Sequence, residues 1–224
     1  MSRRARSDSK RKTVSGADGT GSSPILELLV IFLVVYVAQV LTAFVGAMAG
    51  LFVLAPPLTE NPWTIVTSVY AHGGLGHLLS NSVALVVFGW PVARATTRLR
   101  FHTFFLVTGA LAGIAQILLT GAFATLPSTP VSATAGVLGA SGAVFALLGY
   151  LLAANRLSDA FASVITVPRW VTIAIFLVLA AIVTLATAQP GVALVAHFSG
   201  FLLGLVAGRA GVLGPGSHAS RTGR

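Results

Sequence analysis

Long uncharged and mostly apolar intervals dominate the chain, and charged residues lie at their ends. Four intervals are long enough to cross a bilayer, and they run between Glu27 and Glu60, Glu60 and Arg94, Arg100 and Arg156, and Arg169 and Arg209. A membrane-spanning helix needs about 20 mostly apolar residues. The first two intervals each have room for one helix, and the last two each have room for two helices joined by a proline-containing turn. The pattern therefore predicts six membrane-spanning helices.

We expect these helices near residues 25–54, 72–93, 101–123, 141–155, 170–188 and 192–208. The fourth is short for a span, so its start is expected below the outer surface, at the floor of a cavity. Residues 1–24 are polar, basic and rich in Ser and Gly, which predicts a disordered N-terminus, and residues 211–224 predict a flexible tail. The expected fold is an all-α membrane protein, with one six-helix domain over residues 25–210.

The distribution of charged residues predicts how these helices are oriented in the membrane. The chain carries 14 Lys and Arg against 5 Asp and Glu, and 55% of its residues are hydrophobic. The net charge of +9 would suit a nucleic-acid partner, but the basic residues lie at the ends of apolar intervals, so the expected partner is the lipid bilayer and not nucleic acid. All 14 basic residues fall on one side of a six-helix arrangement. The positive-inside rule then predicts a multi-pass protein of the cell membrane with an uncleaved first helix and both termini in the cytoplasm.

The residue types inside the expected spans exclude several kinds of chemistry. The chain has no Cys, so thiolate nucleophiles and thiolate zinc sites are excluded. Apart from Glu27 at an edge, no carboxylate lies within a span, so neither a pair of catalytic aspartates nor a His-Glu-x-x-His zinc site can be built there. We expect no metal and no cofactor. Ser and His remain as the candidate reactive groups.

Ser141 lies in the segment Gly-Ala-Ser-Gly at the expected start of the fourth helix. It is either an ordinary helix cap or a nucleophile beside unpaired backbone N–H groups that stabilise an oxyanion. His197 lies at a similar depth in the sixth helix. Small residues form a stripe on each of these two helices, at Gly142, Ala146, Gly149 and Ala153 and at Gly200, Gly204 and Gly208. If the stripes meet, Ser141 can come within hydrogen-bond reach of His197.

His77 and Asn81 are four residues apart and therefore project from one face of the second helix. They either hydrogen-bond to other helices as structural groups or donate to a negative charge that develops during acyl transfer. His72, at the expected outer end of that helix, is more consistent with a structural role, bonded to a loop carbonyl or a neighbouring His.

Three segments together resemble the rhomboid family of intramembrane serine proteases. They are His77-Leu-Leu-Ser-Asn81, Gly139-Ala140-Ser141-Gly142 with the apolar helix that follows, and Ala196-His197-Phe198-Ser199-Gly200. Their order and spacing agree with the family over about residues 25–209. The combination is far more specific than any one of the motifs.

The resemblance implies a Ser–His dyad without a carboxylate, in which Ser141 is the nucleophile and His197 the general base. It implies an oxyanion hole made by His77, Asn81 and the backbone N–H of Ser141. The supporting residues that it implies are His72, Gly139, Gly142 and Phe145. The implied substrates are single-span membrane proteins, cut within or beside their transmembrane segments.

The sequence departs from the family pattern at two places. Trp63 matches the Trp of a Trp-Arg pair that bacterial members carry after the first helix, but Thr64 replaces the Arg, and the expected loop over residues 55–63 is short. Phe145 replaces a Tyr, although its ring can still pack against His197. Two other functions stay open: a catalytically silent rhomboid-like protein that binds membrane clients, and a small transporter, which the position of the polar residues near the outer end disfavours.

Overall fold

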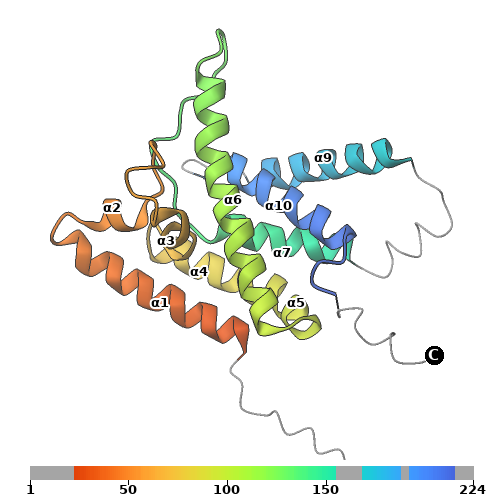
Figure 1. Ribbon diagram of the computed structural model, residues 1–224, viewed down its shortest axis with the longest axis horizontal. Helices are drawn as coiled ribbons and strands as arrows, with labels where there is room; N and C mark the ends of the chain where they lie inside the picture. Colours follow the sequence, from red (N-terminus) through yellow and green to blue (C-terminus); the bar gives the residue numbers. More distant parts are fainter. Residues whose placement is uncertain (1–22, 155–167, 188–191, 215–224) are drawn as a thin grey trace, which may run out of the picture.

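The computed structural model describes residues 23–154, 168–187 and 192–214, drawn in colour in Figure 1. The expected disordered N-terminus lies almost entirely outside these residues, as do Asn155, Ala188 and most of the expected C-terminal tail. The described part is helical, and its only extended pairing is one isolated bridge between Leu54 and Val137.

The described helices follow one another as α1 (Pro24–Ala43), α2 (Met48–Phe52), α3 (Thr64–Tyr70), α4 (Leu75–Ala84), the π-helical turn η1 (Leu85–Gly89), α5 (Trp90–Ala95), α6 (Arg98–Ala124), α7 (Ser141–Ala153), α9 (Arg169–Ala186) and α10 (Leu194–Arg209). Since α4, η1 and α5 are continuous, they form one helix over Leu75–Ala95. The longest helix, α6, extends beyond the others at one end (Figure 1).

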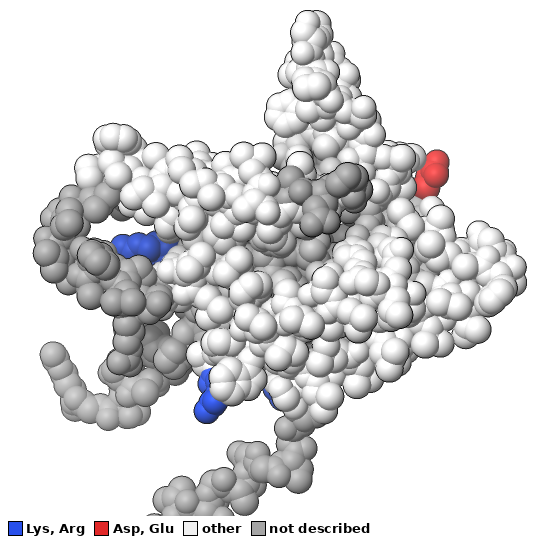
Figure 2. Space-filling model, turned by 180° about the vertical axis from the view of Figure 1, so that it is seen from behind, with Lys and Arg blue, Asp and Glu red and all other residues white. Residues whose placement is uncertain are grey.

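Three helices are long and apolar enough to cross a membrane, namely Pro24–Ala43, Leu75–Ala95 and Arg98–Ala124. The helices α7, α9 and α10 are also apolar, but their apolar stretches are shorter. The buried share of the apolar window is 22% in α1 and 44% in α6, so α6 is more enclosed by protein than α1. Figure 2 shows few charged side chains on the face that it presents, as expected for a surface in contact with lipid.

The expected first helix over residues 25–54 is wrong in its length. Helix α1 ends at Ala43, and Gly46, with a φ of +71°, lies in the turn that separates it from α2. The connection to the second long helix therefore contains α2 and α3 and is longer than the expected short loop over residues 55–63. Within it, Trp63 Nε1 donates a hydrogen bond to the Gly50 carbonyl at 2.9 Å. Hydropathy did not mark the turn, because the turn itself is apolar and exposes Phe44 and Val45.

The small-residue stripes of α7 and α10 meet, which is the condition on which the approach of Ser141 to His197 depends. A Cβ atom on Gly200 would lie 2.1 Å from the carbonyl oxygen of Gly142, and one on Gly204 would lie 2.0 Å from that of Ala146. Both distances are too short for non-bonded atoms, so the two backbones are in direct contact. This contact brings the N-terminal turns of α7 and α10 together, and Ser141 and His197 lie on those turns.

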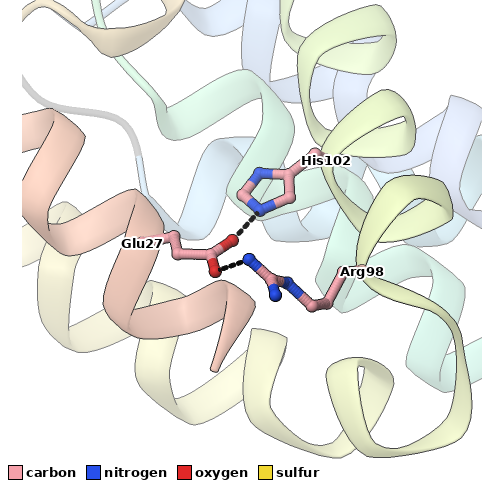
Figure 3. A network of polar contacts seen from close by, with 3 residues as sticks. All are labelled: Glu27, Arg98 and His102. Carbon is pink, nitrogen blue, oxygen red and sulfur yellow. Dashed lines mark hydrogen bonds and ion pairs between the residues drawn. The ribbon is translucent and has the colours of Figure 1, made fainter. Parts of the chain in front are cut away.

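A polar cluster away from the N-terminal turns of α7 and α10 connects α1 to α6 (Figure 3). The Glu27 carboxylate contacts the Arg98 guanidinium through one oxygen and His102 Nε2, at 2.7 Å, through the other. This network holds the starts of α1 and α6 side by side, far along α6 from the turn that precedes α7.

Candidate active site

Ser141 is the first residue of α7, and the backbone turn that leads to it depends on Gly139. Gly139 has a φ of +136°, and its N–H donates to the Ser68 carbonyl at 2.9 Å, which fixes the turn before the helix. The N-cap position belongs to Ala140, so the hydroxyl of Ser141 is not the cap that one interpretation of the sequence expected. Within the described residues, Ser141 Oγ has no hydrogen-bond partner, and its N–H is among those left unpaired at a helix start.

The ring of His77 lies directly beside Gly139 and near the Ser141 hydroxyl. A Cβ atom on Gly139 would lie 2.7 Å from Cε1 of His77, 3.0 Å from its Nε2 and 3.8 Å from Ser141 Oγ. Any side chain at position 139 would therefore displace the imidazole. On its other side, His77 Nδ1 accepts the N–H of Gly73 at 3.2 Å. In the neutral ring, Nε2 then carries the proton and is a donor on the side of Gly139.

Asn81 lies one turn further along α4 and is buried. Its Nδ2 donates to the carbonyl oxygen of His77 at 3.0 Å, a bond within its own helix. No bond from Asn81 to another helix is present in the part of the chain that the structure describes. The interpretation of Asn81 as a residue that joins helices therefore lacks the contact that it requires.

His197 lies in the first turns of α10 and is buried, 7% exposed. Phe145, one turn after Ser141 on α7, stacks on its ring with the centroids 4.2 Å apart and the planes at 22°. This confirms that an aromatic ring without a hydroxyl can pack against His197. Among the described residues, His197 Nδ1 has no hydrogen-bond partner, and no hydrogen bond joins His197 to Ser141.

His72 precedes α4 instead of lying on it, and it supports His77 by packing. Its ring meets the His77 ring edge-on at a centroid distance of 5.3 Å and the Phe32 ring at 4.8 Å. Its backbone N–H donates to Gln39 Oε1 at 2.9 Å, and its carbonyl accepts from Gln39 Nε2 at 3.3 Å. Neither ring nitrogen of His72 has a hydrogen bond of ordinary geometry in the described residues, so the ring is held chiefly by packing.

One cavity of about 1130 Å³ brings the candidate residues together. Its lining includes His77, Asn81, Ser141, Phe145 and His197. The cavity therefore has a hydroxyl, imidazole rings and an amide on one lining, a set of groups suited to acyl transfer. Within the described residues, no group of three or more His, Asp or Glu could hold a metal ion.

The lining also includes polar residues that the sequence analysis did not single out. Among them are Gln116 of α6 and Thr134 of the segment before α7, and Gln116 Nε2 donates to Thr134 Oγ1 at 2.8 Å. The signal was present, because a Gln within an apolar span is costly without partners.

Comparison with known proteins shows the family of the chain. The rhomboid domain matches residues 59–213. The chain is 30% identical over 162 residues to RHOMBOID-like protein 4 of Arabidopsis thaliana, which covers 72% of the chain and 37% of that protein. It is 34% identical over 90 residues to Rhomboid protease GluP of Bacillus subtilis (strain 168), which covers 40% of the chain and 15% of that protein. The chain thus spans well under half the length of these relatives. Since the rhomboid domain covers more than half of the chain, the chain belongs to the rhomboid family.

Proposed function

We propose that this protein is an intramembrane serine endopeptidase that cleaves transmembrane or membrane-proximal segments of single-span membrane proteins. The observation that carries the proposal is the shared cavity, in which Ser141 Oγ, the His197 ring, His77 and Asn81 lie together. Membership of the rhomboid family and the name of the relative GluP, a rhomboid protease, agree with it.

In the proposed reaction, Ser141 Oγ attacks a substrate carbonyl carbon while His197 accepts the hydroxyl proton. The negative charge that develops on the carbonyl oxygen is stabilised by His77 Nε2–H, the Asn81 amide and the backbone N–H of Ser141. His197 then gives the proton to the departing amine, and water hydrolyses the acyl-enzyme by the same steps. Ser141 and His197 are not hydrogen-bonded in the described structure, and catalytic hydrogen bonds are often long or poorly aligned until substrate is bound.

In the proposed arrangement, the protein crosses the cell membrane six times. Both termini lie in the cytoplasm, and the cavity opens on the outer side. The starts of α7 and α10 then face outward, so cleavage occurs near the outer end of a client helix. A stable helix hides its carbonyl groups in backbone hydrogen bonds. Clients with Gly, Pro or β-branched residues near the cut, which weaken a helix, are therefore preferred.

The test is labelling of the purified protein with a serine-directed fluorophosphonate, with the modified residue located by mass spectrometry. We expect labelling at Ser141, no labelling of Ser141→Ala, and loss of labelling and of model-substrate cleavage in His197→Ala, since nucleophile and base act as a unit. Ser80→Ala is the matched control, because Ser80 lines the same cavity but donates to the His77 carbonyl at 3.0 Å. Equal labelling of the parent protein and Ser141→Ala would contradict the proposal.

The second candidate is a catalytically silent rhomboid-like protein that binds membrane clients. Loss of the Ser or the His would favour it, and this chain keeps both Ser141 and His197. The two functions differ in one measurement: a silent protein retains a client transmembrane peptide in proteoliposomes without cutting it, and its Ser141 is not labelled.

A further inference from the structure

Gln116 is a neutral amide buried in the middle of α6, with a side chain that is 6% exposed. Its two polar atoms bond to two different segments of the chain. Oε1 accepts the backbone N–H of Ala196 at 3.0 Å, and Nε2 donates to Thr134 Oγ1 at 2.8 Å. Gln116 therefore connects α6 to the start of α10 and to the segment that leads to α7.

The bond to Ala196 replaces a helix cap. Helix α10 begins at Leu194, and its first N–H groups have no acceptor within the helix. Ala193 at the N-cap position has no side-chain oxygen, and the first internal bond joins the His197 N–H to the Ala193 carbonyl at 3.1 Å. Gln116 thus supplies, from another helix, the acceptor that a Ser or Asp at the N-cap would ordinarily supply. The capped residue immediately precedes His197.

The bond to Thr134 is part of a closed set of contacts with Thr120. The Thr134 N–H donates to Thr120 Oγ1 at 3.1 Å, and the two hydroxyl oxygens are 3.0 Å apart. Thr120 Oγ1 also donates to the Gln116 carbonyl at 2.6 Å. Thr134 is therefore fixed to one turn of α6. The segment that continues from it enters the Gly139 turn and ends at Ser141.

We infer that Gln116 is a positioning residue for the proposed Ser141–His197 dyad. It lies on α6, which carries neither member, and its amide fixes the backbone before each of them. Because reaction within the dyad depends on the mutual placement of two helices, loss of this amide changes the relative positions of Ser141 and His197 without removing either group. This inference rests on the proposed function for its catalytic part only.

The first measurement needs no activity. Hydrogen exchange of the Ala196 amide is followed by NMR in detergent micelles for the parent protein, Gln116→Leu and Gln116→Glu. Loss of the acceptor in Gln116→Leu should raise the exchange rate about tenfold or more. In Gln116→Glu, the carboxylate still accepts from Ala196 and can accept from the Thr134 hydroxyl, so exchange should stay near the parent rate.

The second measurement is the rate of fluorophosphonate labelling, together with kcat and KM for a model substrate. Gln116→Leu should lower labelling and kcat by about tenfold to a hundredfold with KM nearly unchanged, since the geometry of attack and not client binding is affected. Thr134→Val removes one arm of the network and should give a smaller loss. The matched control is Thr108→Val, a buried residue of the same helix whose hydroxyl donates to the Phe104 carbonyl of α6 itself.

Three results would overturn the inference. One is unchanged Ala196 exchange in Gln116→Leu, another is unchanged labelling despite faster exchange, and the third is a loss in Thr108→Val as large as that in Gln116→Leu. If Gln116→Leu fails to fold, Thr134→Val and Gln116→Glu decide: a labelling rate in Thr134→Val equal to that of the parent overturns it. Failure of the proposed function gives a different result, because the parent protein is then not labelled by the fluorophosphonate. The exchange rate of the Ala196 amide still shows whether Gln116 accepts a hydrogen bond from the start of α10.

Discussion

The Nδ1 atom of His77 has a backbone partner, and this bond decides which ring nitrogen carries the proton. Nδ1 accepts from the Gly73 N–H at 3.2 Å, so the proton of the neutral ring lies on Nε2. Because Gly139 has no side chain, the ring can occupy the space beside Ser141. A histidine at this position is therefore a donor toward the cavity, which is the property that an oxyanion hole needs.

Substitution of Asn81 tests whether its amide donates to the oxyanion, and it should have little effect on the fold. Asn81→Ala should lower kcat by about a hundredfold, because removing one oxyanion donor costs about 3 kcal/mol of transition-state stabilisation. The melting temperature should change little, since Asn81 Nδ2 bonds only to its own helix in the described structure. Both quantities are measured on purified protein, by cleavage kinetics and by thermal unfolding in detergent.

Ser82→Ala is the control for Asn81→Ala. Ser82 is the next residue on α4, and its hydroxyl likewise donates to the carbonyl four residues earlier, that of Leu78, at 2.8 Å. It should lose the same kind of bond without any loss of kcat. An Asn81→Ala protein with full activity and a lowered melting temperature would assign Asn81 a structural role instead.

At the scale of elements, the contact between α7 and α10 is the most demanding feature of the fold. Gly204→Ala should strongly destabilise the protein and reduce labelling of Ser141, because the added Cβ would lie 2.0 Å from the Ala146 carbonyl oxygen. Neither atom is at the flexible end of a side chain, so the helices must separate, at a cost of about 1–3 kcal/mol or more. Thermal unfolding and labelling measure the two effects.

Gly121→Ala provides the matched comparison for Gly204→Ala. Gly121 lies within α6, and a Cβ atom there would meet nothing within 4 Å. Ala is favoured over Gly in a helix by about 1 kcal/mol, so this variant should be as stable as the parent or more stable. Equal stability of the two variants would mean that the close approach of α7 and α10 is not required.

Hydropathy does not predict where α1 ends. The end of α1 at Ala43 could not be predicted, because the residues that follow, Phe44 and Val45, are as apolar as the helix itself. In a soluble protein such a turn would be polar. Next to lipid it need not be, so the boundary depends on the backbone turn at Gly46 and not on composition.

At the scale of the whole molecule, the orientation in the membrane can be tested because the chain has no native Cys. Leu99 and Leu126 lie near the two ends of α6, and both are more than half exposed. If the basic residues mark the cytoplasmic side, Leu126→Cys should react with a membrane-impermeant maleimide added to intact cells. Leu99→Cys should react only after lysis, and mass spectrometry measures both reactions. The reverse pattern would contradict the proposed orientation and, with it, a cavity open to the outside.

The sequence alone determined the class of the protein and the candidate residues. Residue order is enough to recognise the uncharged intervals and the scarcity of carboxylates within them. It also shows the candidate residues in their motifs, namely Ser141, His197, His77 and Asn81. They stand out because charged and polar groups are costly inside a bilayer and are therefore rare there. The small-residue stripes can also be recognised from residue order, but residue order does not show that they meet.

Only the tertiary structure decided how those residues are held. The Gly73–His77 bond and the position of Gln116 between Ala196 and Thr134 join residues through contacts that residue order does not specify. A hydrogen bond requires a donor and an acceptor about 3 Å apart in a favourable direction. Residue order supplies the two groups, but only the packing of one helix on another sets that distance.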